Sequence, residues 1–373
     1  MSELSNYKPD NHSPDNHLAK KKGSLSEKIE LQGVSQHFRG AAMRALGGEL
    51  VAVDDVSITL VSDPPHILSL VGESGSGKST IARIILGLQK PTSGSVTYDG
   101  KDIYKLSSAE LTSFRRGVQV VFQDPYGIFN PFYRVDRVFW TAIRKLHLAK
   151  RREEGMALIE ESLEAVGLRK EDVLGRYPHQ LSGGQRQRLM LARVHMMRPS
   201  FIIADEPISM LDAAIRVLFL NIMLDFKQKY GMTTLFITHD LSTAYYLGGE
   251  IMIISQGRIV EHGSVDDVML RPAHPYTQLL ISSLPVPDPD SRWQERLVIT
   301  EQTAETGPIT HERCLFSNRC PYVMDRCRVE RPVMVPVREG HEATCFLYGP
   351  GRPERSALDT APASSETAPR SPQ

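Results

Sequence analysis

The sequence has few cysteines, no excess of either charge and no long apolar run. Lysine plus arginine and aspartate plus glutamate both total 44, so the formal net charge is zero. This balance argues against a strongly basic nucleic-acid-binding protein and leaves local patches undecided. No apolar run approaches the ~18 residues that a membrane-spanning helix needs. The N-terminal residues are polar and lack the apolar segment of a secretory signal, so we expect the chain to stay in the cytosol.

The four cysteines all lie between residues 314 and 345. In a reducing compartment, such clustering suggests metal ligation more than disulfide bonds. A length of 373 residues suffices for two domains, or for one large domain with appendages. We expect residues 1–26 to form a disordered tail, and the Pro-, Ala- and Ser-rich residues 349–373 to form another.

A glycine-rich stretch over residues 72–80 fits the pattern G-x-x-x-x-G-K-[ST]. It follows an apolar run at 67–71 and precedes a helical pattern at 81–86, the context in which this pattern indicates a phosphate site. Glycines let backbone N–H groups turn around an anion, and the helix adds the positive end of its dipole. Lys78 is predicted to reach the β- and γ-phosphates and Ser79 to ligate Mg²⁺. The alternative is a Gly/Ser turn before a lysine. The predicted nucleotide-binding residues of this loop are Gly72, Ser74, Gly75, Ser76, Gly77, Lys78, Ser79 and Thr80.

A second stretch with anion-binding features is Leu181–Gln185, which precedes a helical pattern that Pro199 ends. A small hydroxyl and two glycines at a helix entrance offer backbone donors to an anion. Taken alone, the stretch could equally be a turn. Its predicted nucleotide-binding residues are Ser182, Gly183, Gly184 and Gln185.

Two apolar runs end in polar side chains. Asp205 and Glu206 follow the run at 201–204, as expected of a buried parallel strand whose carboxyl end faces a ligand. Asp205 fits a Mg²⁺ carboxylate, and Glu206 is placed to orient or deprotonate an attacking water. His239 ends the run that begins at Thr234, and a neutral imidazole there could hydrogen-bond a γ-phosphate or the attacking water. The alternative is that these groups are ordinary solvated acids and a structural histidine.

In their order along the chain, these motifs closely resemble those of the ATPase subunit of an ABC transporter, over residues 29–348. The resemblance implies an α/β fold: a RecA-like P-loop NTPase core with an antiparallel β subdomain, a helical subdomain and a small C-terminal extension. It implies an ATPase domain at 27–265 with its helical subdomain at about 124–185, followed by an extension at 266–348. ATP and Mg²⁺ are the implied ligands.

The resemblance also assigns roles to three further residues. Phe38 resembles the aromatic residue that stacks on adenine, Gln123 the glutamine that contacts Mg²⁺ and the attacking water, and Asp212 part of the loop that crosses the dimer interface. In this family two ATPase domains sandwich ATP head to tail, each phosphate loop facing the partner's Ser-Gly-Gly segment. Residues 124–135 resemble the groove that receives a permease's coupling helix; ordinary core packing of these aromatics is the alternative.

The C-terminal part resembles the extension of oligopeptide and dipeptide importer ATPases, with His274-Pro275-Tyr276-Thr277 followed by the cysteines. Members of this family with four such cysteines are associated with a [4Fe–4S] cluster, and four thiolates can also hold zinc. The spacing lacks any C-x-x-C, so cluster, zinc and free thiols all remain open. The candidate ligands are Cys314, Cys320, Cys327 and Cys345.

The resemblance predicts an ATP-hydrolysing subunit of a membrane importer for di- and oligopeptides or related solutes such as oligosaccharides. Its partners would be a second, related ATPase, two permease subunits and an extracytoplasmic solute-binding protein, with no nucleic acid. It would lie peripherally on the cytoplasmic face of the inner membrane. The alternatives are a soluble ABC-type ATPase that acts on a cytosolic complex, and a silent partner that only binds ATP. The presence of Glu206, His239 and Ser182 argues against the silent partner.

Overall fold

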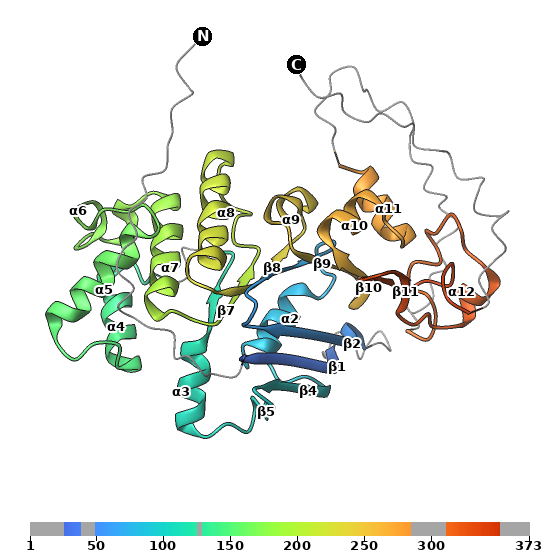
Figure 1. Ribbon diagram of the computed structural model, residues 1–373, viewed down its shortest axis with the longest axis horizontal. Helices are drawn as coiled ribbons and strands as arrows, with labels where there is room; N and C mark the ends of the chain where they lie inside the picture. Colours follow the sequence, from blue (N-terminus) through green and yellow to red (C-terminus); the bar gives the residue numbers. More distant parts are fainter. Residues whose placement is uncertain (1–25, 39–48, 125–128, 285–310, 351–373) are drawn as a thin grey trace, which may run out of the picture.

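The computed structural model describes residues 26–38, 49–124, 129–284 and 311–350 (Figure 1). Residues 1–25 and 351–373 of the tails expected at the two ends, and residues 125–128 of the aromatic segment, lie outside these described residues. The described part contains two β-sheets, a group of helices beside the larger sheet and a C-terminal extension on the opposite side (Figure 1).

The smaller sheet is antiparallel, with strand order β2-β1-β4-β5. Its strands are β1 (Lys28–Phe38), β2 (Leu50–Val61), β4 (Ser93–Tyr98) and β5 (Lys101–Asp102). Strands β1 and β2 pair antiparallel. Their residues largely alternate between buried and exposed, because one face of such a sheet covers the core and the other meets solvent.

The larger sheet has strand order β11-β12-β10-β9-β3-β8-β7-β6. Its strands are β3 (Ile67–Val71), β6 (Val118–Val121), β7 (Phe201–Asp205), β8 (Thr233–Thr238), β9 (Glu250–Ser255), β10 (Arg258–Ser264), β11 (Val335–Arg338) and β12 (His341–Ala343). Strands β6, β7, β8, β3 and β9 pair in parallel, so their carboxyl ends share one edge. The loops after β3, β7 and β8 therefore meet there, and these loops carry the predicted site residues.

Helices connect many of these strands in the described part of the chain. They are α2 (Lys78–Ile85), α3 (Ser108–Gly117), α4 (Asp136–Leu146), α5 (Arg152–Glu164), α6 (Lys170–Val173), η1 (Pro178–Gln180), α7 (Gly183–Met197), α8 (Ala213–Gln228), α9 (Leu241–Leu247), α10 (Val265–Leu270), α11 (Pro275–Ser282) and α12 (Asp325–Val329). A capping box opens α3, in which Ser107 and Glu110 are bonded reciprocally. Helices α4, α5, α6 and η1 fall within residues 124–185, where the resemblance implies a helical subdomain, and α7 continues beyond that range (Figure 1).

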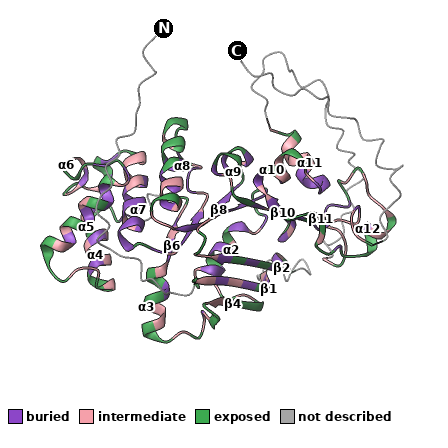
Figure 2. Cartoon of the chain, viewed as in Figure 1, coloured by how far each residue is buried: buried purple, intermediate pink, exposed green. Residues whose placement is uncertain are grey.

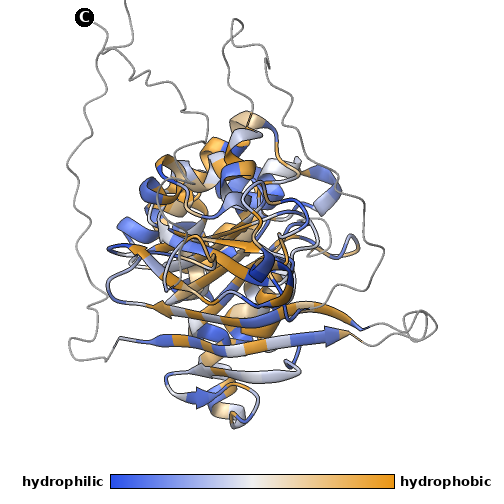
Figure 3. Ribbon diagram, turned by 90° about the vertical axis from the view of Figure 1, so that its right-hand side faces the viewer, coloured by the Kyte–Doolittle hydropathy of each residue, from blue (hydrophilic) through white to orange (hydrophobic). Residues whose placement is uncertain are grey.

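Two large apolar clusters hold these layers together. One fills the space between the two sheets and α2, and the other joins the helical part to β6, β7 and α8. Burial is concentrated in the strands of the larger sheet, and the outer faces of the helices are exposed (Figure 2). Figure 3 shows the same strands as the most hydrophobic part of the molecule. Continuous burial of β3, β7 and β8 explains why their sequences are apolar without alternation.

The larger sheet continues into the C-terminal extension, because β12 pairs with β10 and β11 pairs with β12. The extension therefore shares backbone hydrogen bonds with the rest of the larger sheet. Among the described residues, no helix is long and apolar enough to cross a membrane.

Candidate functional site

The loop between β3 and α2 has a backbone that only glycine permits at two of its positions. Gly77 has φ 102°, and a Cβ there would lie 2.2 Å from the carbonyl oxygen of Ala52. A Cβ on Gly72 would lie 2.1 Å from the carbonyl oxygen of Ile254. These contacts fix the loop against β2 and β9, so the loop lies beside the smaller sheet with its N–H groups at the start of α2.

Lys78 folds back over the same loop. Its Nζ donates to the carbonyl oxygens of Gly72 and Glu73, both at 2.8 Å, and its side chain is only 4% exposed. Burial is the main cause that lowers the pKa of Lys78, and the carboxylates of Glu206, Asp205 and Glu73 oppose that shift. A phosphate anion beside Nζ would stabilise the charged ammonium further, because an opposite charge favours the ionised form.

Asp205 ends β7 next to the first turn of α2, where its Oδ1 accepts a hydrogen bond from the Ser79 hydroxyl at 3.0 Å. Burial is the main cause that raises the pKa of Asp205; the Ser79 hydrogen bond opposes this shift, and the charge of Glu206 adds to it. A hydroxyl and a carboxylate that meet at a partly buried, negative position are hard oxygen ligands of the kind Mg²⁺ takes. The pair therefore fits a magnesium ion bound beside the phosphate loop.

Glu206 lies one residue beyond β7 in a left-handed conformation, with φ 46°. Its N–H donates to the carbonyl oxygen of Ile237 at 2.9 Å, which ties this turn to β8. Its Oε2 is 3.2 Å from Nδ1 of His239, and its Oε1 is 4.0 Å from Nζ of Lys78. An uncommon backbone conformation that aims a carboxylate toward an imidazole and a lysine is typical of functional sites.

A cavity of about 260 Å³ opens beside these groups. Its lining includes Glu206, Thr238, His239 and Asp240 from the carboxyl ends of β7 and β8, together with Ser209. The cavity has room for a water molecule next to the Glu206 carboxylate. The structure thus brings together the predicted phosphate loop, Asp205, Glu206 and His239 from three separate parts of the chain.

The Ser-Gly-Gly stretch is not part of this cluster. Ser182 caps α7 by accepting from the N–H of Gln185, while the Gln185 side chain accepts from the N–H of Ser182. Helix α7 packs on α5, β6 and α8 and lies apart from α2 (Figure 1). Ser182 is exposed. Within one chain, the two predicted phosphate-binding stretches therefore do not meet.

The remaining predicted residues, Phe38, Gln123 and Asp212, are exposed. Phe38 ends β1 and is 38% exposed. Gln123 lies in an exposed bend after β6, two residues before the undescribed segment. Asp212 is exposed at the start of α8. Each is accessible, and none of the three touches the phosphate loop through a recorded hydrogen bond.

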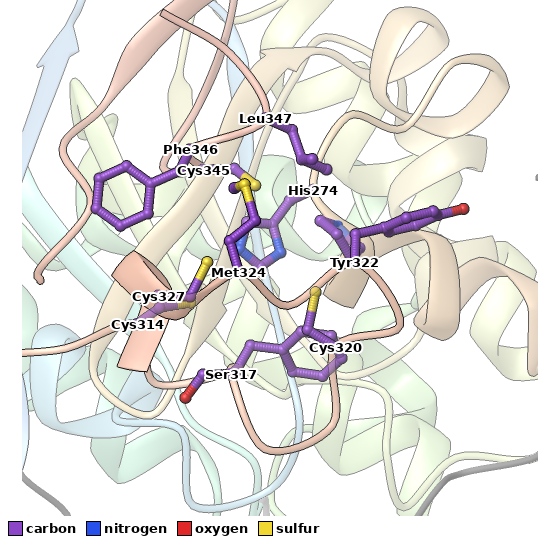
Figure 4. A pocket seen from close by; sticks show the side chains of 12 residues that line it. His274, Cys314, Ser317, Cys320, Tyr322, Met324, Cys327, Cys345, Phe346 and Leu347 are labelled. Carbon is purple, nitrogen blue, oxygen red and sulfur yellow. The ribbon is translucent and has the colours of Figure 1, made fainter. Parts of the chain in front are cut away.

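The four cysteines line one pocket in the C-terminal extension, together with His274, Phe316 and Met324 (Figure 4). Burial raises the pKa of Cys314, that of Cys320 to about 11 and that of Cys345 to about 12, and the neighbouring thiols add to each shift. These thiols are therefore protonated unless a cation is bound. Among the described residues, however, no set of three or more His, Cys, Asp or Glu side chains converges closely enough for one metal ion.

Two contacts to the phosphate loop escaped the sequence reasoning. The N–H of Glu73 donates to Oη of Tyr276 at 3.3 Å, and the Glu73 carboxylate lies 3.7 Å from the guanidinium of Arg319. In the sequence Tyr276 is only part of the His-Pro-Tyr-Thr segment that resembles the importer extension, and no periodicity signals a contact across 203 residues.

Comparison with known proteins identifies the class. The pattern of the family "ABC transporter" matches residues 53–209, and that of "Oligopeptide/dipeptide transporter, C-terminal region" matches residues 260–327. A peptide import ATP-binding protein of Brucella ovis is 36% identical over 320 residues, which cover 85% of this chain and 97% of that protein. The oligopeptide transport ATP-binding protein OppF of Bacillus subtilis is 41% identical over 268 residues, or 71% of this chain and 85% of OppF.

The fold agrees with a solved structure, that of the dimeric ATP-binding cassette MJ0796 in a post-hydrolysis state bound to ADP and Pi. Its TM-score is 0.55 at 28% identity, and the match covers 64% of this chain and 98% of that one. Fold and sequence thus define an ATP-hydrolysing P-loop enzyme of the ATP-binding cassette class, coupled to transport. Within that class, the chain belongs to the family of ATP-binding subunits of oligopeptide and dipeptide ABC transporters.

Proposed function

We propose that this protein powers the uptake of di- and oligopeptides, or of related solutes such as oligosaccharides, as the peripheral ATPase of an importer on the cytoplasmic face of the inner membrane. The observation that carries the proposal is the continuous alignment with peptide-import ATPases through both the cassette and the extension. Purification of the subunit from membranes in mild detergent, followed by a screen of the accompanying solute-binding protein against peptide and sugar ligands, tests it. Recovery without any integral membrane protein would contradict the proposal.

Each site residue has a proposed role, which for Gln123 rests on the resemblance alone. Lys78 and the N–H groups of the glycine-rich loop bind the phosphates, and Ser79, Asp205 and Gln123 surround the Mg²⁺ site. The ion supplies positive charge that neutralises the β- and γ-phosphates. Glu206 takes the proton of the attacking water, and His239 holds the Glu206 carboxylate in place through its 3.2 Å contact.

The working unit is proposed to be a dimer with a second, related ATPase. The separation of Ser182 from the phosphate loop supports this, because the exposed entrance of α7 then remains available to a nucleotide held by the partner. Exposed Asp212 would lie in the crossing loop and Phe38 against adenine. Two permease subunits and an extracytoplasmic solute-binding protein complete the importer.

A groove of about 500 Å³ beside α4 is the proposed permease contact. Its described lining combines apolar side chains, among them Phe129, Val138 and Met197, with basic ones and contains no aspartate or glutamate. The basic residues are Arg115, Arg134, Arg137, Lys145 and Arg193. The Nε atom of Arg193 is buried and has no hydrogen-bond partner among the described residues. Charge complementarity therefore favours a short permease helix that carries a carboxylate.

Lys145→Glu is expected to weaken the association with the permease, because the new carboxylate repels the partner's acidic side chain. Co-purification of the permease in detergent should fall severalfold, with ATP binding by the isolated subunit unchanged. The matched control is Arg144→Glu, which reverses the exposed adjacent charge on α4 outside the groove lining. Equal permease recovery with both variants would remove the groove from the interface.

A [4Fe–4S] cluster is our proposal for the four-cysteine pocket, with zinc as the alternative. The four cysteines surround one pocket and match the number of thiolates that either group takes, but the pocket's volume of about 10 Å³ means that the cysteines must move apart to admit a cluster. Tetrahedral zinc needs sulfur atoms only about 3.8 Å apart, given Zn–S bonds of about 2.3 Å. Among the residues that the structure describes, no three or more metal-ligating side chains converge in this way. A cluster is a larger body and separates its ligands more widely.

Cys320→Ser is expected to abolish the iron content and visible absorbance of protein purified without oxygen, because one of four ligands is lost. Ser317→Ala is the control, since Ser317 lines the same pocket and is not a candidate ligand. Parent protein that is colourless and free of iron would contradict the cluster, and zinc found in its place would support the alternative.

A further inference from the structure

The second residue of the phosphate loop, Glu73, is held from both sides. Its carbonyl oxygen accepts from Lys78 Nζ at 2.8 Å, and its N–H donates to Oη of Tyr276 at 3.3 Å. The first contact comes from the loop's own helix, and the second comes from α11 of the C-terminal extension. We infer that Tyr276 is a positioning residue for the phosphate loop, so that the extension sets the nucleotide affinity of the ATPase.

Tyr276 is itself firmly anchored. It is 1% exposed, and its N–H donates to Nδ1 of the preceding cap residue, His274, at 3.0 Å. The N–H of His274 donates to Oε2 of Glu261 at 2.8 Å, and the other oxygen of Glu261 lies 2.7 Å from Nε2 of His341. Both Glu261 and His341 are fully buried. The hydroxyl that contacts Glu73 therefore belongs to a network that spans β10, α11 and β12, and its position does not depend on the loop.

A second pair of contacts joins the same loop to the four-cysteine pocket. The ring of Phe316, which lines that pocket, meets the Tyr276 ring edge to face, with centroids 5.6 Å apart. Arg319 lies 5.7 Å from the Phe316 ring and 3.7 Å from the Glu73 carboxylate. That ion pair is about half exposed and is weak by itself. The buried Tyr276 therefore contributes most to the positioning of the phosphate loop, and Phe316 packs against its ring.

We expect the loss of the Tyr276 contact to weaken nucleotide binding and to change the chemical step little. A loop that already has its bound shape loses less conformational freedom when phosphate arrives, so it binds more tightly. Tyr276 contacts the loop at Glu73 and does not line the cavity beside Glu206, so its loss should leave proton transfer unchanged. This inference rests on the proposed assignment of residues 72–80 to nucleotide binding.

The test compares two Tyr→Phe variants of the full chain. Tyr276→Phe removes the hydroxyl that receives the Glu73 N–H. Tyr348→Phe removes a hydroxyl of the same extension that donates to the carbonyl oxygen of Ala273 at 3.1 Å and does not reach the loop. For Tyr276→Phe we expect the Kd for ATP to rise about two- to tenfold, the range for one lost hydrogen bond. Hydrogen exchange at the Glu73 amide should accelerate, and kcat at saturating ATP should change little. Tyr348→Phe should leave all three at parent values.

Two results would overturn the inference. One is an unchanged Kd and unchanged amide exchange for Tyr276→Phe; the other is an equal rise in Kd for both variants, which would reflect a general loosening of the extension. Lys78→Ala, measured alongside, distinguishes a wrong phosphate-loop assignment from a wrong role for Tyr276. If Lys78→Ala also leaves the Kd unchanged, the phosphate-loop assignment fails; if it weakens binding while Tyr276→Phe does not, only the role of Tyr276 fails.

Discussion

Glu206→Gln is expected to lower kcat for ATP hydrolysis by about 10²- to 10⁴-fold, the range attributed to a general base. Glutamine has the same shape and can keep the contact with His239, but it cannot accept a proton from water. Bound ATP should therefore persist, and the variant should accumulate as a closed dimer with its partner ATPase. Phosphate release measures the first effect, and size-exclusion chromatography with ATP measures the second.

The control for this variant is Glu153→Gln, the same change at an exposed position of α5. It should hydrolyse ATP at the parental rate. Near-normal hydrolysis by Glu206→Gln would mean that another group takes the proton, and the role of the carboxylate at the end of β7 would then have to be abandoned.

Lys78→Ala should weaken ATP binding by roughly tenfold to a hundredfold, because it removes a charge-assisted hydrogen bond to phosphate. Nζ already lies over the loop, 2.8 Å from two of its carbonyl oxygens, so the wild-type lysine needs little reorganisation to meet a phosphate. Calorimetry or a fluorescent ATP analogue measures the Kd.

Lys78 is buried, and its truncation could disturb the loop. Lys78→Met keeps most of the aliphatic side chain, removes the ammonium and should show the same loss. Lys90→Ala, at an exposed position after α2, should bind ATP normally. Parental affinity in both Lys78 variants would remove residues 72–80 from the nucleotide site.

Much of the core could be predicted from local pattern. The apolar runs at 67–71, 201–205 and 233–238 are buried parallel strands, and the predicted polar residues stand at their carboxyl ends. These strands could be predicted because a strand buried on both faces needs an unbroken apolar run. The polar residues could be predicted because ligands of such sheets bind at the carboxyl ends of the strands. The capping box at Ser107 was equally local, since its two hydrogen bonds lie within four residues.

The extension was less predictable. Strands β11 and β12 span only Val335–Arg338 and His341–Ala343, too short for a periodic signal, and Pro336 lies inside the first. They form strands because β10 offers an edge with which β12 can pair. The clustering of the cysteines was visible in their spacing, whereas the geometry of their thiols depends on how the segment folds around Phe316 and Met324.

The sequence by itself determined which chemical groups are available to this protein. Each feature is local in the chain: a glycine-rich loop with a lysine, carboxylates after an apolar strand, and a serine-capped helix. Only the tertiary structure decided which of these groups meet. It brings Lys78, Asp205, Glu206 and His239 to one edge of the sheet and leaves Ser182 apart from them. It also places Tyr276 in contact with Glu73 of the phosphate loop, 203 residues earlier in the chain. The physical reason is that hydrogen bonding and burial within an element depend on neighbours along the chain, whereas contacts between elements depend on strand order and packing, which no local pattern records.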